Sequence, residues 1–365
     1  MRIIQFIPTI AYGDAVGNDA VALRKVIEEM GYETGIYAES VVPPLGRKTA
    51  MLINELPELN EKDVGILHLS TGAQLNYDFA KFPCKKVVIY HNVTPPCYFS
   101  DSDSYIEGIN QWALEAVKYL ADKVDYCIAD SEYNKEELVK MGYQCPIDVL
   151  PVLIPFDDYR KKPNASVLKH YSDGNTNIVF TGRIVPNKKQ EDIIAAFYYY
   201  KKYYDPTARL FIVGAYKEEN RYYRRLKKYV EQLELQDVVF TGHIGFDEIL
   251  AYYKIASVFL CMSEHEGFCV PLVEAMFFQV PIVAYNSSAI PYTLGHSGFL
   301  IDTQNPLEVA GIMNYIVKNN EVQQQLIEGQ SIRLGDFAYE QIKDRFEELL
   351  KEFLRGEKNE KDSIN

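Results

Sequence analysis

Residues 177–188 read NIVFTGRIVPNK, and this stretch decides the fold. An apolar, β-branched run ends at Thr181, Gly182 allows a sharp turn, and helical periodicity follows. Arg183 and Lys188 are therefore predicted in a loop between a strand and a helix. Ligands of parallel sheets bind beyond the carboxyl ends of the strands, so two cations beside a helix N-terminus predict a site for a diphosphate. Without that placement they would be ordinary solubilising charges.

The alternation of strands and helices extends in both directions from this stretch. Apolar runs at 2–7, 64–69 and 85–90 precede it, and runs at 209–213 and 257–261 follow it. Amphipathic helical patterns separate these runs. The pattern predicts an α/β chain of βαβ units, with parallel sheets and helices on both faces of each sheet.

The alternation breaks at 151–176, a segment rich in Pro, Asp, Asn and Lys. The 365 residues also exceed the roughly 250–300 residues that one hydrophobic core commonly holds. Both observations predict two doubly wound, Rossmann-like domains joined by a linker. The predicted divisions are an N-terminal domain, a C-terminal domain, a closing helix and a flexible tail, at 1–165, 166–337, 338–355 and 356–365.

A second candidate site follows the predicted strand at 257–261. Residues 263–276 read SEHEGFCVPLVEAM. Pro271 suits the first turn of a helix, which predicts Glu266 in the preceding loop and Glu274 within that first turn. Both carboxylates would then converge near a helix N-terminus, and a carboxylate can accept both hydroxyls of a ribose or hexose diol. The alternative is that Glu274 only complements the helix dipole.

Together, Gly182-Arg183…Lys188 and Glu266-x7-Glu274 resemble the signature of the family 4 retaining glycosyltransferases, which have the GT-B fold. The resemblance covers almost the whole chain. It implies two Rossmann-like domains facing a cleft, with a closing helix that crosses back onto the first domain. It also implies transfer of a sugar from a nucleotide diphosphate donor with retention of anomeric configuration. The second domain would bind the donor and the first domain the acceptor.

The same resemblance implies roles for individual residues. Arg183 and Lys188 would hold the diphosphate. Glu274 would bind the ribose hydroxyls and Glu266 the donor sugar. Backbone N–H groups of a short loop would face the sugar and phosphate, with a tighter contour because the family usually has Gly where Cys269 stands. The further donor-binding residues are Gly182, Gly267, Phe268, Cys269, Val270, His243 and Ile244.

The loop at 12–19, YGDAVGND, follows the first predicted strand. The family commonly has Gly-Gly here, close to the donor phosphates, whereas this chain has Asp14-Ala15. The donor-binding candidates of the loop are its two glycines and its asparagine: Gly13, Gly17 and Asn18. An equally weighted alternative is a plain turn before a helix that is capped by Asn18 or Asp19.

His91 directly follows the predicted strand at 85–90. The resemblance implies a position near the donor sugar, and the alternative is an ordinary hydrogen-bonded residue at a strand end. His68, in the strand at 64–69, faces the same edge of the sheet and could meet the acceptor. The candidate catalytic residues are His91, Arg183, Lys188 and Glu266.

Asp101-Ser102-Asp103 resembles the Asp-x-Asp by which a different glycosyltransferase fold binds Mn²⁺ or Mg²⁺. It lies in a polar turn, and the donor phosphates already have two cations, so no metal site is predicted. No cofactor is predicted either, since the nucleotide sugar is the donor substrate. The six cysteines include no Cys-x-x-Cys pair, and their spacing indicates neither a zinc cluster nor a redox motif.

The 51 Asp and Glu residues outnumber the 38 Lys and Arg residues, which gives a formal charge of −13. Such an acidic chain has no global electrostatic footprint for nucleic acid. No apolar run approaches the roughly 18 residues of a membrane span, while peripheral membrane contact stays open. The N-terminal apolar run is too short for a signal peptide, and we expect a cytoplasmic protein.

These patterns predict a retaining, metal-independent hexosyltransferase. It would move a sugar to the hydroxyl of a glycan, lipid-linked or other acceptor, in polysaccharide or glycoconjugate synthesis. One alternative is a catalytically inactive partner subunit that binds a nucleotide sugar. Another is a different enzyme on the same fold, such as a sugar phosphorylase or a nucleotide-sugar epimerase. The presence of both motifs argues against a decayed site.

Overall fold

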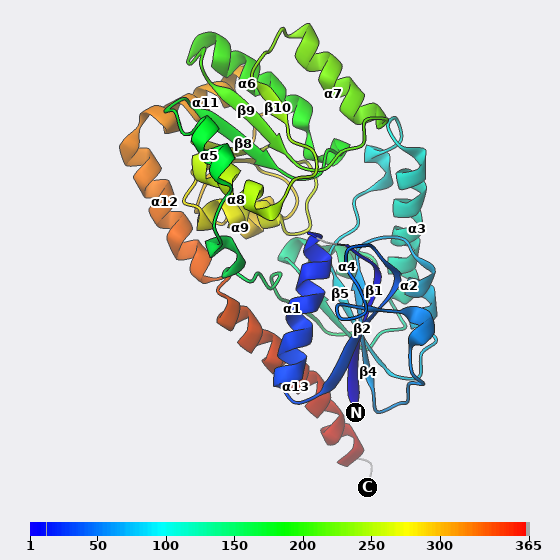
Figure 1. The fold of residues 1–365 in the computed structure, drawn as a ribbon. Helices are drawn as coiled ribbons and strands as arrows, with labels where there is room; N and C mark the ends of the chain where they lie inside the picture. Colours follow the sequence, from blue (N-terminus) through cyan, green and yellow to red (C-terminus); the bar gives the residue numbers. More distant parts are fainter. Residues whose placement is uncertain (12, 363–365) are drawn as a thin grey trace. The chain divides into compact units, whose positions relative to one another are not determined.

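The computed structural model describes residues 1–11 and 13–362, without the side chains of 357–362. The chain forms two compact units (Figure 1). Unit 1 consists of Met1–Pro96, Gly108–Pro155 and the chain from Phe337 onward. Unit 2 consists of Cys97–Glu107 and Phe156–Asp336, so a short segment from the first half of the sequence belongs to it.

Unit 1 is built on a seven-stranded parallel sheet with the order β3-β2-β1-β4-β5-β6-β7. The order reverses between β1 and β4, and the loops after these strands therefore flank a topological switch point. The elements are β1 (Arg2–Ile10), α1 (Ala15–Glu29), β2 (Glu33–Val41), β3 (Met51–Leu52), β4 (Val64–Leu69), α2 (Gln74–Phe79), β5 (Lys85–Tyr90), α3 (Ser104–Leu120), β6 (Tyr126–Ala129), α4 (Glu132–Lys140), β7 (Ile147–Val149) and α13 (Tyr339–Asp362).

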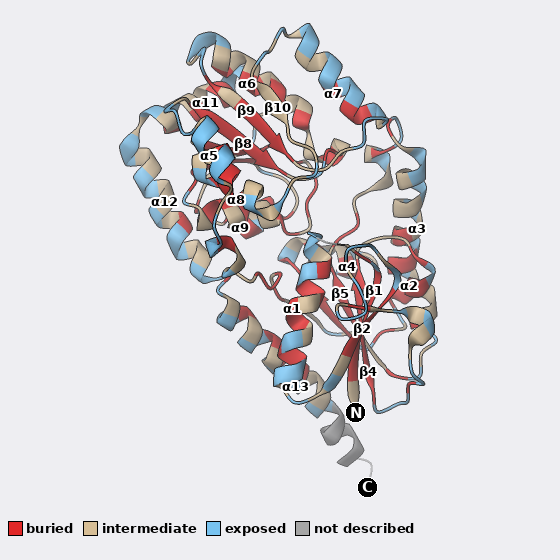
Figure 2. Ribbon diagram, viewed as in Figure 1, coloured by how far each residue is buried: buried red, intermediate tan, exposed pale blue. Residues whose placement is uncertain are grey.

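Both faces of this sheet are buried, as Figure 2 shows by the red strands. Alternate residues of a strand point to opposite faces. On β4, Val64 and Ile66 pack with side chains of α1 and α13. Leu67 and Leu69 point the other way and pack with α2, α3 and α4. Helices thus cover both faces, as the continuous apolar runs predict.

The last helix of the chain completes the core of unit 1. Ile342, Phe346 and Leu349 of α13 are at most 3% exposed and pack with strand residues and with α1. Phe353 stacks on Tyr126, with ring centroids 5.4 Å apart. The helix continues to Asp362, into the segment predicted as a flexible tail, and residues 363–365 lie outside the described part of the chain.

Unit 2 is built on a six-stranded parallel sheet with the order β10-β9-β8-β11-β12-β13, which reverses between β8 and β11. The loops after β8 and β11 are those that carry the two predicted motifs. The elements are α5 (Ala165–Tyr171), β8 (Asn177–Thr181), α6 (Gln190–Tyr203), β9 (Arg209–Val213), α7 (Arg221–Gln232), β10 (Val238–Phe240), α8 (Phe246–Ile255), β11 (Val258–Cys261), α9 (Val270–Phe277), β12 (Ile282–Tyr285), α10 (Ile290–Leu294), β13 (Phe299–Ile301), α11 (Pro306–Lys318) and α12 (Asn320–Gly335).

Five elements were not predicted, namely β3, α2, α5, α10 and α12. Four of them are only two to seven residues long and leave little periodic signal. The long helix α12 has no apolar stripe that periodicity could reveal, since the buried residue of this helix is the polar Gln330. The Gln330 amide donates to the Val280 carbonyl (2.8 Å), so a hydrogen bond fastens this helix where a buried leucine would be expected.

Candidate functional site

The loop after β8 carries Gly182, Arg183 and Lys188 at the switch point of the unit 2 sheet. The Gly182 N–H donates to the last carbonyl of β9 (2.9 Å). A Cβ atom on Gly214 would lie 2.0 Å from the Gly182 carbonyl oxygen, so only glycine permits this approach. The loop continues as a 3₁₀ helix, η4 (Pro186–Lys188), which leads into α6.

Two of the predicted site residues are in direct contact. The Lys188 ammonium nitrogen lies 2.5 Å from each carboxylate oxygen of Glu266, and the two side chains are 18% and 8% exposed. Burial lowers the pKa of Lys188, but the charge of Glu266 outweighs burial and the pKa is raised. Lys188 is therefore a fixed cation oriented by Glu266. Arg183, on the same loop, is exposed and forms no ion pair with a described residue.

Asn187, which sequence reasoning did not single out, joins this loop to the loop after β11. Its side-chain amide nitrogen donates to the main-chain carbonyl of His265 (2.9 Å). Its main-chain carbonyl accepts from the N–H of Glu264 (2.9 Å). Asn187 is 3% exposed. A second link is the ion pair between Lys189 and Glu264 (3.1 Å). The two loops that the sequence predicts to form one site are thus fastened together.

Glu274 lies in the second turn of α9 and not in the first turn as predicted, because the helix begins at Val270. Each of its carboxylate oxygens accepts from a tyrosine hydroxyl, Tyr159 at 2.8 Å and Tyr253 at 2.6 Å. Burial raises the pKa of Glu274, although both hydrogen bonds work in the opposite direction. A carboxylate held in this way does more than complement the helix dipole, whose effect fades after the first turn.

The loop between Glu266 and α9 contains the predicted backbone donors. Cys269 is the N-cap residue of α9, and Val270 is the first residue of the helix. The Phe268 carbonyl accepts from a buried threonine hydroxyl of α10, and Gly267 is half-buried. These residues therefore surround the start of a helix, as predicted.

The loop after β10 holds His243 and Ile244. Gly242, just before them, forms an antiparallel bridge with Gly214, the glycine that packs on Gly182. This contact brings the loop to the edge of the site. His243 is exposed and Ile244 is half-buried, and no hydrogen bond or ion pair with a described residue joins either of them to the Lys188 loop.

The N-terminal loop of unit 1 is organised by a residue that was not predicted as a cap. α1 begins at Ala15, and the Asp14 side chain accepts from the Gly17 N–H (3.0 Å) as its N-cap. The predicted caps, Asn18 and Asp19, are wrong because both residues lie inside the helix. Asp14 caps the helix because it directly precedes the first turn and its carboxylate reaches the free N–H groups there.

The two candidate glycines of this loop differ in their surroundings. Gly17 is buried, and a Cβ atom on it would lie 3.0 Å from the Ile10 side chain, so this glycine lets α1 pack closely on β1. Gly13 has φ +76°, a conformation that favours glycine, and open space where a Cβ atom would be. Tyr12 lies outside the described residues.

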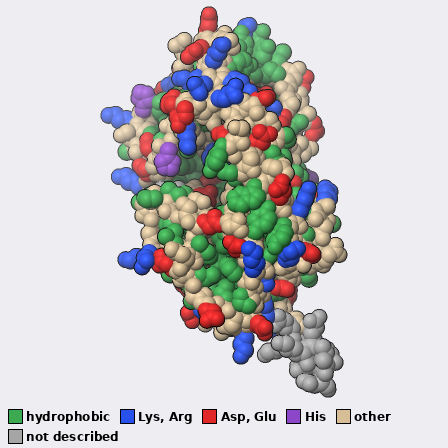
Figure 3. Space-filling model, turned by 90° about the vertical axis from the view of Figure 1, so that its right-hand side faces the viewer, with side chains coloured by type: hydrophobic (Ala, Val, Ile, Leu, Met, Phe, Trp, Pro, Cys, Tyr) green, Lys and Arg blue, Asp and Glu red, His purple; other side chains and the backbone are tan. Residues whose placement is uncertain are grey.

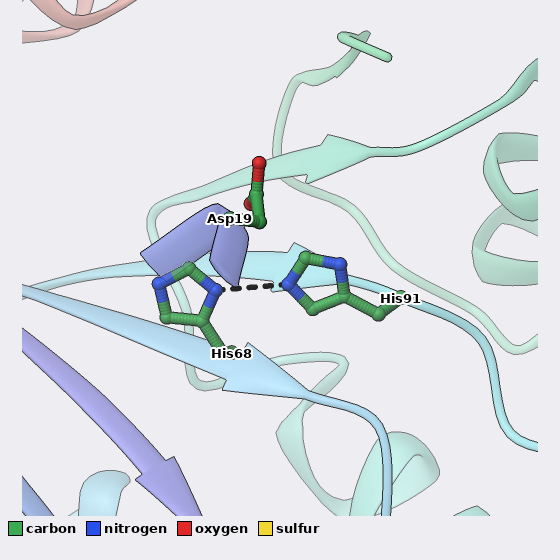
Figure 4. A group of neighbouring side chains, drawn as sticks. All are labelled: Asp19, His68 and His91. Atoms are coloured by element: carbon green, nitrogen blue, oxygen red, sulfur yellow. Dashed lines mark hydrogen bonds between the residues drawn. The ribbon is translucent and has the colours of Figure 1, made fainter. Parts of the chain in front are cut away.

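A chain of buried polar side chains runs through His91 and His68 at the carboxyl ends of β5 and β4 in unit 1 (Figure 4). His91 Nδ1 lies 2.8 Å from Asp130 Oδ2, and His91 Nε2 lies 2.8 Å from His68 Nδ1. His68 Nε2 lies 2.8 Å from Gln5 Oε1. Asp19 of α1 lies beside the two rings, and its carboxylate accepts from a backbone N–H (2.8 Å).

The partners determine where the protons lie. The Gln5 amide nitrogen donates to a carbonyl (3.1 Å), so its oxygen accepts and His68 Nε2 carries a hydrogen. Burial and the neighbouring His91 lower the pKa of His68, which leaves Nδ1 as an acceptor for the His91 N–H. Burial also works against charge on His91, but Asp130 outweighs it and the pKa of His91 is raised. The two ring nitrogens of His91 both face hydrogen-bond acceptors, an arrangement that favours its charged form. Both ring nitrogens of His68 are also engaged, so neither is left to bind the sugar acceptor.

Two sets of described side chains have the chemistry of metal ligands. In the first set, Asp19 with His68 and His91, the facing imidazole nitrogens already bond to each other, so the set fits a metal poorly. The second set is Cys261, Glu266 and Cys269.

The predicted turn residue Asp103 caps α3, since its side chain accepts from the N–H of the third residue of that helix (3.1 Å).

On the face in Figure 3, Lys and Arg side chains lie among Asp and Glu side chains.

Among the described residues, none of the helices combines the length and the apolar character that crossing a bilayer requires.

Comparison with known proteins gives a family match in unit 2. Residues 166–331 match the family model of glycosyl transferases group 1. A GDP-mannose-dependent alpha-(1-6)-phosphatidylinositol monomannoside mannosyltransferase of Mycobacterium tuberculosis is 27% identical over 212 residues, 54% of this chain and 54% of that protein. A D-inositol 3-phosphate glycosyltransferase of Streptomyces bingchenggensis is 26% identical over 135 residues, 36% of this chain and 30% of that protein. The chain spans about half the length, or less, of these curated relatives.

Solved structures resemble nearly the whole chain in fold. A crystal structure of Anabaena HepE in complex with UDP and glucose has a TM-score of 0.72 at 18% identity and covers 96% of this chain and 100% of that one. Sucrose-phosphate synthase from Thermosynechococcus elongatus has a TM-score of 0.75 at 16% identity, covering 98% and 100%. Together with the two parallel sheets, these likenesses confirm the predicted GT-B fold class.

Proposed function

Because residues 166–331 are a glycosyl transferases group 1 region, as the sequence resemblance indicated, we propose that the chain is a retaining glycosyltransferase. Its donor is a nucleotide diphosphate sugar, and its acceptor is a hydroxyl of a glycan or a lipid-linked sugar. The relatives that act on mannosyl phosphatidylinositol and on inositol phosphate support a polar, hydroxyl-rich acceptor. Neither a metal ion nor another cofactor takes part.

One observation carries the proposal. The loops after β8 and β11 flank the switch point of the unit 2 sheet, and they carry Arg183, Lys188 and Glu266, with Glu274 in the helix that follows. Lys188 touches Glu266, and Glu274 is oriented by two tyrosines. This combination supplies positive charge for a diphosphate and a fixed acceptor for the ribose diol.

The chemistry follows from the charges. As the anomeric C–O bond breaks, negative charge grows on the departing diphosphate and positive charge on the sugar ring. Lys188, which stays charged, and the exposed Arg183 are preorganised to stabilise that diphosphate. The acceptor oxygen forms the new bond on the face that the diphosphate leaves, and its proton passes to a diphosphate oxygen. A contact of His91 in unit 1 with the donor sugar, which the family resemblance implies, remains a prediction.

The test is a screen of UDP-, GDP- and ADP-sugars by thermal stabilisation, followed by donor turnover with the donors that bind. Binding to the folded state raises the unfolding temperature with ligand concentration. We expect one nucleotide class to stabilise the protein and its sugar to be released slowly to water. Arg183→Ala and Glu274→Gln should reduce the stabilisation. Binding without turnover of any donor would favour the inactive partner subunit, and absence of binding to every nucleotide sugar would contradict the proposal.

A further inference from the structure

Unit 2 contains a pair of thiols beside the Lys188–Glu266 ion pair. The proposed transfer reaction does not use these thiols. Cys261 is the last residue of β11, and Cys269 is the N-cap of α9. Their sulfur atoms and a carboxylate oxygen of Glu266 all lie within 4.8 Å of one another. Cys261, Cys269 and Glu266 are 1%, 6% and 8% exposed. Cys261, Glu266 and Cys269 thus form a buried cluster of two sulfur donors and one oxygen donor.

The backbone of Cys269 indicates that its thiol is not there for local geometry. Cys269 has φ 71° and ψ 64°, the left-handed conformation, in which a side chain is strained and glycine is relaxed. Glycine would serve the same turn at lower cost. A strained side chain at a functional site points to a role for that side chain, and here it places a second sulfur atom next to Cys261.

Charge balance also fits a divalent cation. The ammonium of Lys188 already neutralises the carboxylate of Glu266. Binding a divalent ion between two thiols releases two protons, so the total charge of the buried cluster does not change. The ion therefore needs no further counter-charge, and Lys188 can remain beside the cluster.

We propose that Cys261, Cys269 and Glu266 bind a thiophilic divalent cation of the Zn²⁺ class. Two thiolates and a carboxylate form a donor set that zinc accepts, with a fourth position left for water. The ion inhibits the proposed transfer reaction, and this part rests on the proposed function. It inhibits because Glu266 cannot serve both the metal and the donor sugar.

The direct test uses Co²⁺ as a spectroscopic substitute for Zn²⁺ on the reduced, metal-free, full-length protein. We expect one equivalent of Co²⁺ to give thiolate-to-metal charge-transfer absorption, and Zn²⁺ to displace it. Cys261→Ser and Cys269→Gly should each weaken Zn²⁺ binding by about 100-fold or more, since loss of a ligand costs at least as much as loss of its supporting partners. Cys269→Gly also relieves backbone strain, so it should fold.

The matched control is a second thiol pair, Cys127 and Cys145 in unit 1, whose sulfur atoms lie 3.6 Å apart and which no carboxylate of the described residues completes to a set of three metal ligands. The Cys127→Ser variant should keep the Co²⁺ spectrum. Absorption that is lost in Cys127→Ser but kept in Cys269→Gly would move the metal to unit 1 and overturn the proposal. Absence of any thiolate band would overturn it as well.

The activity arm separates the two proposals. With an active donor, Zn²⁺ should inhibit the native protein, while Cys261→Ser should resist inhibition at the same Zn²⁺ concentration. Cobalt binding in a protein that turns over no donor would sustain the metal site and refute the proposed function. Inhibition that is equal in the native protein and in Cys261→Ser would refute the inhibitory role.

Discussion

The Tyr253 hydroxyl donates to Oε2 of Glu274 across 2.6 Å, and the same hydroxyl oxygen lies 2.5 Å from Oγ1 of Thr181 at the end of β8. Since a carboxylate only accepts, the tyrosine hydrogen goes to Glu274 and Thr181 donates to the tyrosine oxygen. Tyr253 is 1% exposed, so this chain of hydrogen bonds is shielded from water. It fixes the carboxylate that we propose for the ribose.

We expect Tyr253→Phe to weaken binding of the donor and of the free nucleotide by about 10-fold, the usual cost of one hydrogen bond to a charged group. The turnover number kcat should change little, because the ribose does not change charge during the reaction. Titration calorimetry and saturation kinetics measure the two effects. Tyr252→Phe is the matched control, since that hydroxyl forms no hydrogen bond with a described residue. Equal losses in both variants would assign the effect to aromatic packing.

Arg183 and Lys188 should affect kcat more than affinity. Their contacts with the diphosphate strengthen as its charge grows, and such interactions appear in the transition state. We expect Arg183→Ala and Lys188→Ala each to lower kcat by about 100-fold or more. Glu274→Gln should instead raise KM for the donor, with a smaller effect on kcat. Circular dichroism checks folding, above all for Lys188→Ala, which leaves Glu266 without its cation. Full kcat in both cationic variants would refute these roles.

The proposed reaction retains the anomeric configuration of the donor sugar. Nuclear magnetic resonance of the first-formed product, recorded before the anomers equilibrate, should show the donor's own anomer. The expectation rests on the resemblance of the Glu266-x7-Glu274 string to the family 4 retaining glycosyltransferases. An inverted product would refute the assignment even if transfer itself were observed.

Activity should persist in excess chelator. Asp103 is engaged as the cap of α3, and Asp101 is an exposed turn residue. The double variant Asp101→Asn with Asp103→Asn should keep its activity, and it should keep its stability because Asn caps helices about as well as Asp. Activity that disappears with chelator and returns with Mn²⁺ would show that a divalent ion takes part in catalysis.

Asp19 should make unit 1 less stable as the pH rises. Burial raises the pKa of Asp19 to about 7 in the folded protein, against 3.8 for an ordinary Asp. Asp130 adds to the effect, while His91 and a backbone N–H oppose it. Between these values the unfolded chain loses the proton and the folded chain keeps it, so stability falls with rising pH and levels off above pH 7.

Asp19→Asn should therefore stabilise the protein, and the gain should grow from about pH 4 to about pH 7 and then level off. Denaturant unfolding at several pH values measures it. Asp14→Asn, at the exposed cap of the same helix, controls for the general loss of a negative charge. A gain that does not vary with pH would show that Asp19 does not titrate in this way.

Much of the fold could be predicted because buried parallel strands are continuous apolar runs. The loops of the unit 2 site could be predicted because Gly182 and Pro271 mark where a strand ends and a helix begins. The start of α9 was misjudged by one residue, which moved Glu274 from the first turn to the second. At the start of α1, three nearby residues could cap a helix, and the cap proposed as an alternative was Asn18 or Asp19, whereas the structure uses Asp14.

The supporting residues could not be predicted, because their partners are far away along the chain. Tyr159 holds Glu274 from 115 residues away, and Asn187 reaches His265 across 78. Gly214 matters only because another backbone passes within 2.0 Å of where its Cβ would be. No local pattern distinguishes such a residue from an ordinary one, since the signal exists only in the folded chain.

The division of unit 1 along the sequence affects how the protein is made. A chain that stops at Asp336 keeps every described strand of both sheets but lacks α13, whose Phe346 is fully buried. Such a truncated chain should bind an apolar dye at the uncovered surface of α1, and a chain that binds no dye would show that α13 is dispensable. On the ribosome, unit 1 begins first but must wait for the last helix, while unit 2 is complete as soon as Asp336 has emerged. Within this stretch of chain, the unit that is begun first is therefore the unit that is completed last.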